Sequence, residues 1–334
     1  MIKNKILKWT LIVLLGLVAL VALVLVCFSL GEKIMFSSFY SKAEKEMAIP
    51  GLSEGYIAQG FDHVDTDGKN IYLACGYMAN GEASRIYVIE KDGKATYSSM
   101  KKANGADYTG HTGGIAHYGD YVYVTAATGC DVFLMSDILD GDGVATVVNQ
   151  VETYNDPAYC VIRNGYLYAG TYYYPEKYET PENYRFSTPG GDYNTAIMTV
   201  YRLDKATGLL ASPLPEKVYS TTGMVQGMAF ADDNTMLLST SWGLSKSHIY
   251  TYDLTKAEFQ ADTTTPRTID IDGTTFDVIF LDSASLVSDV VAPPMSEEII
   301  VLDGRVYIMN ESASNKYIFG KFTTGTHVYS YPVE

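Results

Sequence analysis

The chain repeats one short pattern several times, and this repetition constrains its fold more than any other feature. Residues Ile57–Tyr77 are IAQGFDHVDTDGKNIYLACGY, and residues Met224–Trp242 are MVQGMAFADDNTMLLSTSW. Each contains a Gln-Gly pair, an apolar segment, a turn rich in Asp or Asn, and a second apolar segment. A third apolar segment follows each one, SRIYVIEKDG at Ser84–Gly93 and SHIYTYDLT at Ser247–Thr255. Such internal similarity indicates a repeated structural unit.

Three further copies have the same order of segments. They are Gly113–Met135, Ala158–Tyr174 and Glu297–Ser312, the last completed by Thr326–Val333. Their turns contain Gly-Asp, Asn-Gly and Asp-Gly, and the last two dipeptides are strong hairpin signals. Apolar residues alternate within the segments, and no long helical periodicity occurs after the N-terminal region. Each copy is therefore predicted to be a hairpin followed by a third strand.

These repeats predict an all-β fold, a five-bladed β-propeller that spans residues 56–334. A unit of three or four strands cannot bury both of its apolar faces alone, so the units are expected to stack around an axis. Fourth strands are expected at Ala95–Met100, Ala145–Val151, Glu216–Thr221 and Thr275–Leu281. The last copy has no such segment after it, and residues 31–55 are expected to contribute its closing strand.

A single transmembrane helix is predicted before the propeller. Trp9–Leu30 has 22 residues without a charge. At ~1.5 Å per residue, this helix would be about 33 Å long, enough to cross a hydrocarbon core of about 30 Å. Lys3, Lys5 and Lys8 precede it, so the positive-inside rule places the N-terminus in the cytoplasm and the propeller outside. Residues 1–30 are thus predicted to be a cytoplasmic stub and signal anchor, and residues 31–55 a juxtamembrane segment. The alternative is a cleaved signal, which has a shorter apolar core and a small-residue cleavage site.

Charge and cysteine content argue against several classes of function. All 39 acidic residues and 21 of the 24 basic residues lie after the apolar segment, so that part carries a formal net charge of −18. Such a surface argues against binding nucleic acid or anionic lipid through charge. Cys75, Cys130 and Cys160 are an odd number without CxxC spacing, so we expect buried thiols and no disulfide framework or zinc site.

No metal and no cofactor are expected. His111 and His117 lie six positions apart in a predicted strand, a separation of about 20 Å that is too long for one metal ion. The segment DILDGDG at Asp137–Gly143 lacks the acidic spacing and the later glutamate of a calcium loop. A hairpin turn is expected there.

The innermost strands of a propeller converge at its axis, and the predicted binding site lies at the mouth of that axis. Aligning the copies places at equivalent positions Gln59, Gly113, Ala158, Gln226 and Glu297. The predicted ligand-binding residues are Gln59, His111, Asp156, Tyr159, Gln226 and Glu297. This set offers hydrogen bonds but no nucleophile with an oriented base, so no catalytic residue is predicted. Trp242 is expected either to line a cleft or to be buried between blades.

A tyrosine-rich stretch, YLYAGTYYYPEKYETPENY at Tyr166–Tyr184, continues into a polar insert. Its rings could stack on sugars or peptide side chains, or could be the half-buried residues of a strand that continues into a loop. Together these features predict a binding or scaffolding module for a peptide, a glycan or a partner protein. The alternative is an extracytoplasmic enzyme.

The exported portion resembles exported bacterial β-propeller proteins, and its Gln-Gly segments are similar to blades of propeller-type glutaminyl cyclases. Those enzymes carry a TQGL…YESTG…S…L pattern. Gln59-Gly60 and Gln226-Gly227 match its start, while Ser239–Ser241 and Gly243 match its middle. The glutamate of that pattern is missing, because Ala74 or Ser239 stands near its place. The resemblance implies a five-bladed exported fold. A glutaminyl-cyclase-like or glycan-processing activity is the enzymatic alternative.

Overall fold

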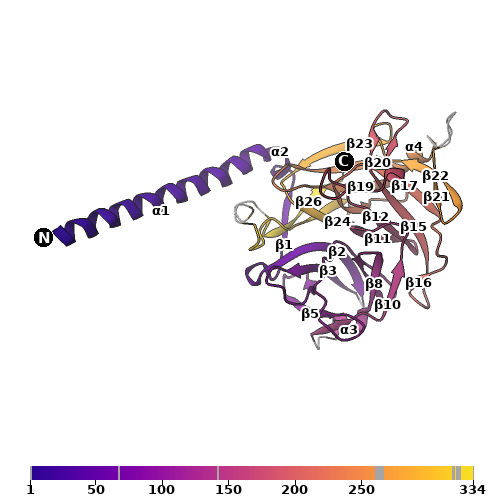
Figure 1. Ribbon diagram of the computed structural model, residues 1–334, viewed down its shortest axis with the longest axis horizontal. Helices are drawn as coiled ribbons and strands as arrows, with labels where there is room; N and C mark the ends of the chain where they lie inside the picture. Colours follow the sequence, from indigo (N-terminus) through magenta and orange to yellow (C-terminus); the bar gives the residue numbers. More distant parts are fainter. Residues whose placement is uncertain are drawn as a thin grey trace.

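A long N-terminal helix projects from a β-rich domain (Figure 1). The computed structural model describes residues 2–66, 68–140, 143–259, 267–317, 320 and 325–333. Helix α1 is Ile2–Met35, and its part Lys5–Met35 is long and apolar enough to cross a membrane, with a mean hydropathy of 3.4 and its most apolar window unburied. A signal sequence near an N-terminus has the same properties. The predicted apolar helix is therefore present, and its length and composition fit either an anchor or a signal sequence.

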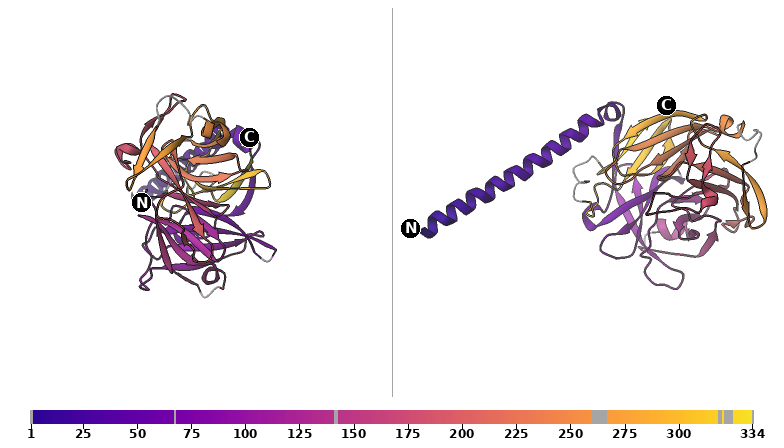
Figure 2. Two further views of the ribbon diagram at one scale, coloured as in Figure 1. Left: turned by 90° about the vertical axis from the view of Figure 1, so that its right-hand side faces the viewer. Right: turned by 45° about the horizontal axis from the view of Figure 1, so that its top comes forward.

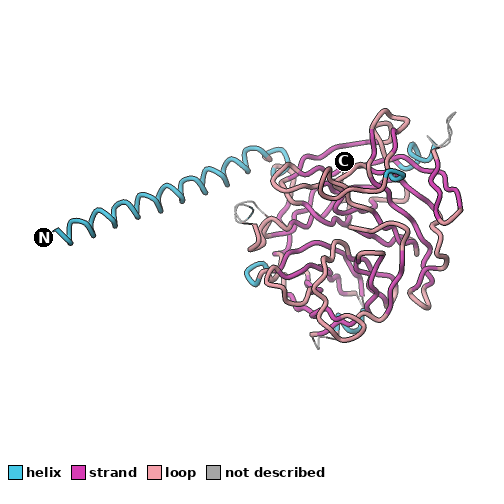
Figure 3. The backbone as a smooth tube through the Cα atoms, viewed as in Figure 1, coloured by secondary structure: helices cyan, strands magenta, loops and turns pink. Residues whose placement is uncertain are grey.

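The domain is built from mainly antiparallel sheets, and strands dominate it throughout (Figure 3). The first sheet contains β2 (Tyr56–Thr66), β3 (Lys69–Met78), β4 (Arg85–Glu90) and β5 (Ala95–Lys101). The second contains β6 (Ile115–Tyr118), β7 (Tyr121–Ala126), β8 (Gly129–Leu134) and β10 (Asn149–Glu152). The third contains β11 (Tyr159–Arg163), β12 (Tyr166–Gly170), β15 (Ala196–Asp204) and β17 (Lys217–Thr221).

Two more sheets follow along the chain. The fourth contains β18 (Val225–Phe230), β19 (Thr235–Thr240), β20 (Ser247–Asp253) and β23 (Leu286–Ala292). The fifth contains β24 (Ser296–Leu302), β25 (Arg305–Asn310), β26 (His327–Pro332) and β1 (Glu44–Ala48). Short elements fill the connections: α2 (Ser37–Tyr40), α3 (Met135–Leu139), α4 (Leu254–Phe259), the 3-10 turns Leu52–Glu54 and Glu182–Tyr184, β13 (Phe186–Ser187), β14 (Tyr193–Asn194) and β16 (Leu209–Leu210).

The innermost strands contact one another in a closed cycle, so the sheets are arranged around an axis (Figure 2). Strand β2 contacts β6, β6 contacts β11, β11 contacts β18, β18 contacts β24, and β24 contacts β2. Glycine permits this close approach: a Cβ on Gly60 would lie 2.6 Å from the backbone nitrogen of Ile115, and one on Gly227 would lie 2.5 Å from the Cα of Glu298. This is a propeller arrangement, as the repeats predict.

Outer strands differ in part from the sequence expectation. Strands β5 and β17 lie where fourth strands were predicted. The prediction for Thr275–Leu281 was wrong, because β22 (Thr274–Phe280) pairs in parallel with β17, and β23 is the fourth strand of its sheet. Strand β22 also pairs with β21 (Thr268–Ile271). In the same way β9 (Val144–Thr146), the first part of the predicted strand Ala145–Val151, pairs in parallel with β5. Both added strands cover sheet edges that would otherwise leave backbone groups unpaired.

The segment between α1 and the first sheet packs on the last sheet. Strand β1 pairs antiparallel with β26, so a strand from the N-terminal part of the chain is the outermost strand of the sheet that contains the last strand. Phe39 of α2 is buried, and its ring stacks on that of Tyr331 with centroids 5.3 Å apart. Residues before the first repeat therefore close the last sheet.

Apolar side chains from adjacent sheets pack against each other. Leu73, Val124 and Phe133, for example, belong to one buried cluster between the first two sheets. Cys75, Cys130 and Cys160 are buried and free of disulfides, which confirms the expectation of buried thiols.

Candidate functional site

The repeated Gln-Gly pair marks a β-bulge on an innermost strand. The pairing of β2 with β3 shifts register between Ala58 and Gly60, and that of β18 with β19 shifts between Val225 and Gly227. Gln59 and Gln226 therefore lie at the positions where the strand register shifts. The pairing of β24 with β25 shifts between Ser296 and Ile299, at Glu297-Glu298. Bulges redirect side chains out of the regular alternation. The repeat signature therefore combines a redirected polar side chain with a small residue that permits close packing.

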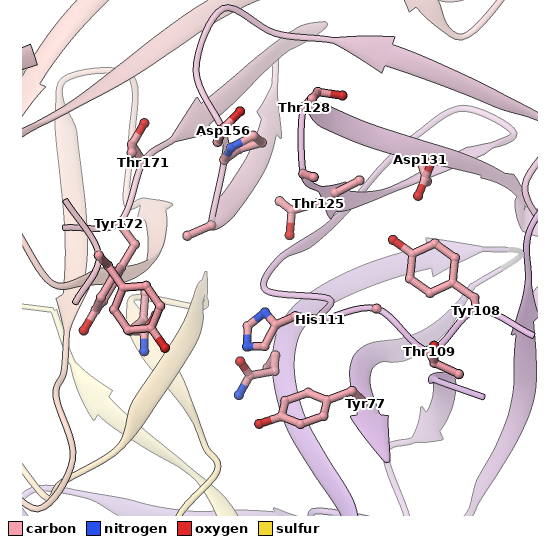
Figure 4. A pocket seen from close by; sticks show the side chains of 18 of the residues that line it. Tyr77, Tyr108, Thr109, His111, Thr125, Thr128, Asp131, Asp156, Thr171 and Tyr172 are labelled. Atoms are coloured by element: carbon pink, nitrogen blue, oxygen red, sulfur yellow. The ribbon is translucent and has the colours of Figure 1, made fainter. Parts of the chain in front are cut away.

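An open cavity of ≈ 1950 Å³ lies at one end of the innermost strands (Figure 4). Four of the predicted site residues line it: Gln59, His111, Asp156 and Gln226. The structure brings these four together from several sheets. His111 lies beside Tyr77, with ring centroids 5.1 Å apart, and Figure 4 shows Asp156 on a different wall of the cavity.

The other two predicted residues are buried and are not among those that line the cavity. The Tyr159 side chain is fully buried, and its ring packs against Gly170. A Cβ added to Gly170 would lie 1.9 Å from the Tyr159 Cζ. Glu297 is 2% exposed and lies beneath Gln226, whose Nε2 donates to its Oε1 over 3.5 Å. Tyr159 thus belongs to the core between sheets, and Glu297 belongs to the layer below the cavity floor.

The floor also contains residues that sequence reasoning missed. Gln59 Nε2 donates to Glu311 Oε2 over 2.9 Å, and the Tyr317 hydroxyl donates to Glu311 Oε1 over 2.8 Å. Lys316 Nζ donates to the Tyr77 hydroxyl over 2.5 Å. Glu311 lies at the end of the last copy, and Lys316 and Tyr317 follow that copy. All three lie away from the aligned inner positions, so repeat alignment could not select them. Their sequence signal is a polar stretch, NESASNKY, directly after an innermost hairpin.

The carboxyl of Glu311 at the cavity floor and that of Glu297 beneath it have perturbed pKa values. Burial raises the pKa of Glu297 well above its usual value, the charges of Glu311 and Glu298 raise it further, and Lys316 opposes the shift. Burial also raises the pKa of Glu311, against the lowering effects of the Tyr317 hydrogen bond, the Lys316 charge and Gln59. Two neighbouring carboxyls in such a site tend to retain protons. Burial lowers the pKa of His111, and Lys316 lowers it further, so its imidazole is favoured as the neutral form.

A third carboxyl occupies the axis itself. Glu298 Oε1 accepts a hydrogen bond from the Met228 backbone nitrogen over 2.9 Å. A Cβ on Gly114 would approach Glu298 Oε2 to 3.0 Å, and one on Gly227 would approach Oε1 to 2.7 Å. Burial raises the pKa of Glu298 well above its usual value. The carboxyl therefore fills the space that two glycines leave between innermost strands.

Aromatic residues Tyr172, Tyr178 and Trp242 line the cavity. We call these three, together with Tyr174, which packs on Trp242, the aromatic rim. Trp242 stacks on Tyr174, with centroids 3.9 Å apart and an interplanar angle of 26°. Tyr178 meets Trp242 edge-on at 6.1 Å and Tyr172 at 5.6 Å. Tyr174 and Tyr178 are paired across a tight turn of the insert, through hydrogen bonds in both directions at 2.9 Å. Trp242 thus lines the cavity, the first of its two expected positions.

No group of three or more His, Cys, Asp or Glu residues that could hold a metal ion occurs among the described residues. The segment Asp137–Gly143, considered above as a calcium loop, includes residues 141 and 142, which lie outside the described residues.

No family model and no curated protein matches the chain. Similar solved structures include the GH43_1 enzyme from Xanthomonas citri, with 12% identity, a TM-score of 0.46, and coverage of 87% of this chain and 92% of that chain. They include a PQQ-bound aldose sugar dehydrogenase from Streptomyces coelicolor, with 12% identity, a TM-score of 0.45, and coverage of 87% and 97%. They also include the Myxococcus xanthus glutaminyl cyclase, with 11% identity, a TM-score of 0.41, and coverage of 87% and 95%. Similarity this low transfers no activity. By its own sheet arrangement the chain is a propeller protein, and its likeness to these enzymes is faint.

Proposed function

We propose that this protein is a five-bladed β-propeller, held at a membrane by α1, that binds a glycan in the cavity at its axial mouth. The five sheets would be the blades, since each contributes one strand to the cycle of innermost contacts. In this proposal β1 closes the ring by pairing with β26. The three lysines before α1 favour a cytoplasmic N-terminus and an extracytoplasmic propeller.

The observation that supports binding is the combination of an aromatic rim with a hydrogen-bonding floor in one cavity. Trp242 and Tyr178 contribute aromatic surface to the lining, and Gln59 and Gln226 contribute amides. A sugar ring has an apolar face that packs on aromatic rings and hydroxyls that bond to amides and carboxyls. Concave sites with a few convergent polar groups are the usual form of small-molecule binding sites.

A second candidate is a glycan-processing enzyme, which the floor carboxyls favour. Glycoside hydrolysis uses two carboxyl groups, one of them kept protonated by its surroundings. Burial raises the pKa values of both Glu297 and Glu311, and the charge of Glu311 raises that of Glu297 further. A glutaminyl-cyclase-like activity has less support. Ala74 and Ser239 are buried where that pattern has its glutamate, and Ser239 Oγ lies 2.9 Å from Ser296 Oγ.

Binding is tested by applying the full-length protein, in detergent micelles, to a glycan array and titrating the retained glycans by calorimetry. We expect Trp242→Ala to weaken binding strongly, because the central ring of the rim is lost. Tyr193→Ala is the control for loss of an aromatic ring, since Tyr193 is 62% exposed and outside the cavity lining. Retention of no glycan, or equal binding by Trp242→Ala, contradicts the proposal.

The enzymatic candidate and the membrane topology need separate measurements. Product analysis of the retained glycans would show turnover, and loss of that turnover in Glu311→Gln would establish catalysis over binding. Protease protection on intact cells tests topology. We expect the propeller to be digested from outside, and a fully protected propeller contradicts the proposed orientation.

A further inference from the structure

Two lysines that line the cavity are held over aromatic rings. Lys177 Nζ lies 4.6 Å from the Trp242 ring centroid and 5.3 Å from that of Tyr178. Lys316 Nζ lies 5.0 Å from the Tyr77 centroid and 5.2 Å from that of Tyr317. Neither ammonium has a carboxylate within 4.0 Å among the residues that the structure describes. Cation–π contacts orient an ammonium without neutralising its charge.

The two lysines face a common part of the cavity. Lys177 lies over the Tyr178 ring. Burial lowers the pKa of Lys316, but its hydrogen bond to Tyr77 and the charges of Tyr77, Glu311 and Tyr178 produce a net increase. Tyr178 is therefore close to both ammonium groups. Lys316 therefore remains charged, and it lines the same cavity as Lys177.

Most acidic groups that line the cavity already have donors. Glu311 accepts from Gln59 and Tyr317. Glu179 pairs with Arg185 at 2.5 Å, and Asp131 accepts from Gln150 at 2.5 Å. Asp156 lies on a different wall from Tyr77 (Figure 4). The part of the chain after the apolar segment has a formal net charge of −18. Its cavity nevertheless contains two ammonium groups that form no ion pair within 4.0 Å among the described residues, although the charge of Glu311 acts on Lys316.

We infer that the ligand of this cavity is an acidic saccharide, a sugar chain whose ring stacks on the aromatic rim and whose carboxylates are bound by Lys177 and Lys316. This inference rests on the proposed function, because it assigns a chemical class to the glycan of the same site. Stacking alone would accept any sugar. The two lysines add a requirement for negative charge, and the half-buried amide of Gln226 binds hydroxyls.

The test titrates the full-length protein in detergent micelles with oligogalacturonate, with a neutral galactose oligomer of equal length, and with oligoglutamate. Each charge-assisted contact of this kind is worth about tenfold in affinity. We therefore expect the acidic sugar to bind at least about tenfold more tightly than the neutral one, with a preference that weakens as salt increases.

Lys177→Gln and Lys316→Gln should each reduce the preference about tenfold. Lys246→Gln removes the same charge from an exposed residue outside the cavity lining and should leave it unchanged. Circular dichroism would establish that all variants are folded.

The outcomes separate the inference from the proposed function. Equal or tighter binding of the neutral sugar overturns the acidic assignment and leaves glycan binding intact. Equal binding of oligoglutamate overturns the saccharide assignment. An unchanged preference in both lysine variants overturns their role. Binding of no sugar at all overturns the proposed function, and the inference with it.

Discussion

Gln59 donates a hydrogen bond to Glu311 across 252 positions of sequence, with 2.9 Å between Nε2 and Oε2. Gln59 stands at the bulge of the first innermost strand, and Glu311 follows the second strand of the last sheet. The bond therefore joins the beginning and the end of the repeat series at the cavity floor. The amide of a residue at an aligned inner position thus orients a carboxyl that is not at such a position.

Removing that amide should change both the acidity of Glu311 and the stability of the domain. Gln59 lowers the pKa of Glu311, so Gln59→Ala should raise it further. Loss of a buried hydrogen bond to a carboxyl should cost about 1–3 kcal/mol in free energy of unfolding. Carboxyl ¹³C titration of glutamate-labelled protein and denaturant unfolding would measure the two effects. Gln150→Ala, which loses a bond to Asp131 instead, should leave the pKa of Glu311 unchanged.

Glu298 should make the protein less stable as pH rises. Its pKa in the folded state is raised above the usual 4.5. The resulting stabilisation is therefore fully present below pH 4.5 and is lost as the pH rises through the folded-state pKa. Thermal unfolding should therefore occur at lower temperature at pH 8 than at pH 5.

Glu298→Gln should raise the unfolding temperature at pH 8 and reduce this pH dependence, because the amide has no charge to bury. Part of the dependence should remain, since the pKa of Glu297 is raised as well. Glu152→Gln, at an exposed residue of β10, is the control. A larger pH dependence in Glu298→Gln than in the unmodified protein would contradict this account of the axis.

Gly227→Ala should destabilise the domain by about 1–3 kcal/mol, because overpacking between rigid strands forces backbone shifts. The added Cβ would lie 2.5 Å from the Cα of Glu298, and backbone cannot rotate away as a side chain can. Gly31→Ala is the control, since its Cβ would meet nothing within 4 Å. Denaturant unfolding measures the stability of both variants. Equal unfolding midpoints for Gly227→Ala and Gly31→Ala would show that β18 and β24 can move apart without loss of stability.

Phe39→Ala should loosen the packing of the N-terminal segment on the last sheet. The ring is 3% exposed and stacks on Tyr331, and truncation of such a side chain costs about 3–5 kcal/mol. Amide hydrogen exchange should increase in β1 and β26 before other strands. Met35→Ala, where the side chain is 75% exposed, should not change that exchange. Faster exchange distributed equally over all sheets would contradict a local closure.

Local sequence determined the strands, their turns and the repeated bulge, because alternation and turn chemistry depend on neighbouring residues. The Gln-Gly pairs predicted equivalent inner positions, and Gln59 and Gln226 line one cavity. Pairing between distant strands was decided only in three dimensions. Both β22 and β23 have strand-like sequences, but β22 joins β17 because an open sheet edge is available there.

The sequence could select some residues of the site, whereas others are brought to it only by the tertiary structure. Gln59, His111, Asp156 and Gln226 could be selected from the sequence because each belongs to, or directly precedes, an innermost strand. Glu311 and Lys316 follow the last innermost hairpin, and Lys177 reaches Trp242 from another blade's insert. These contacts join segments whose sequences carry no signal for one another. Hydrophobic alternation determines which residues form strands, whereas the burial of a carboxyl or the seating of a lysine over a ring depends on which distant strands and loops pack beside it.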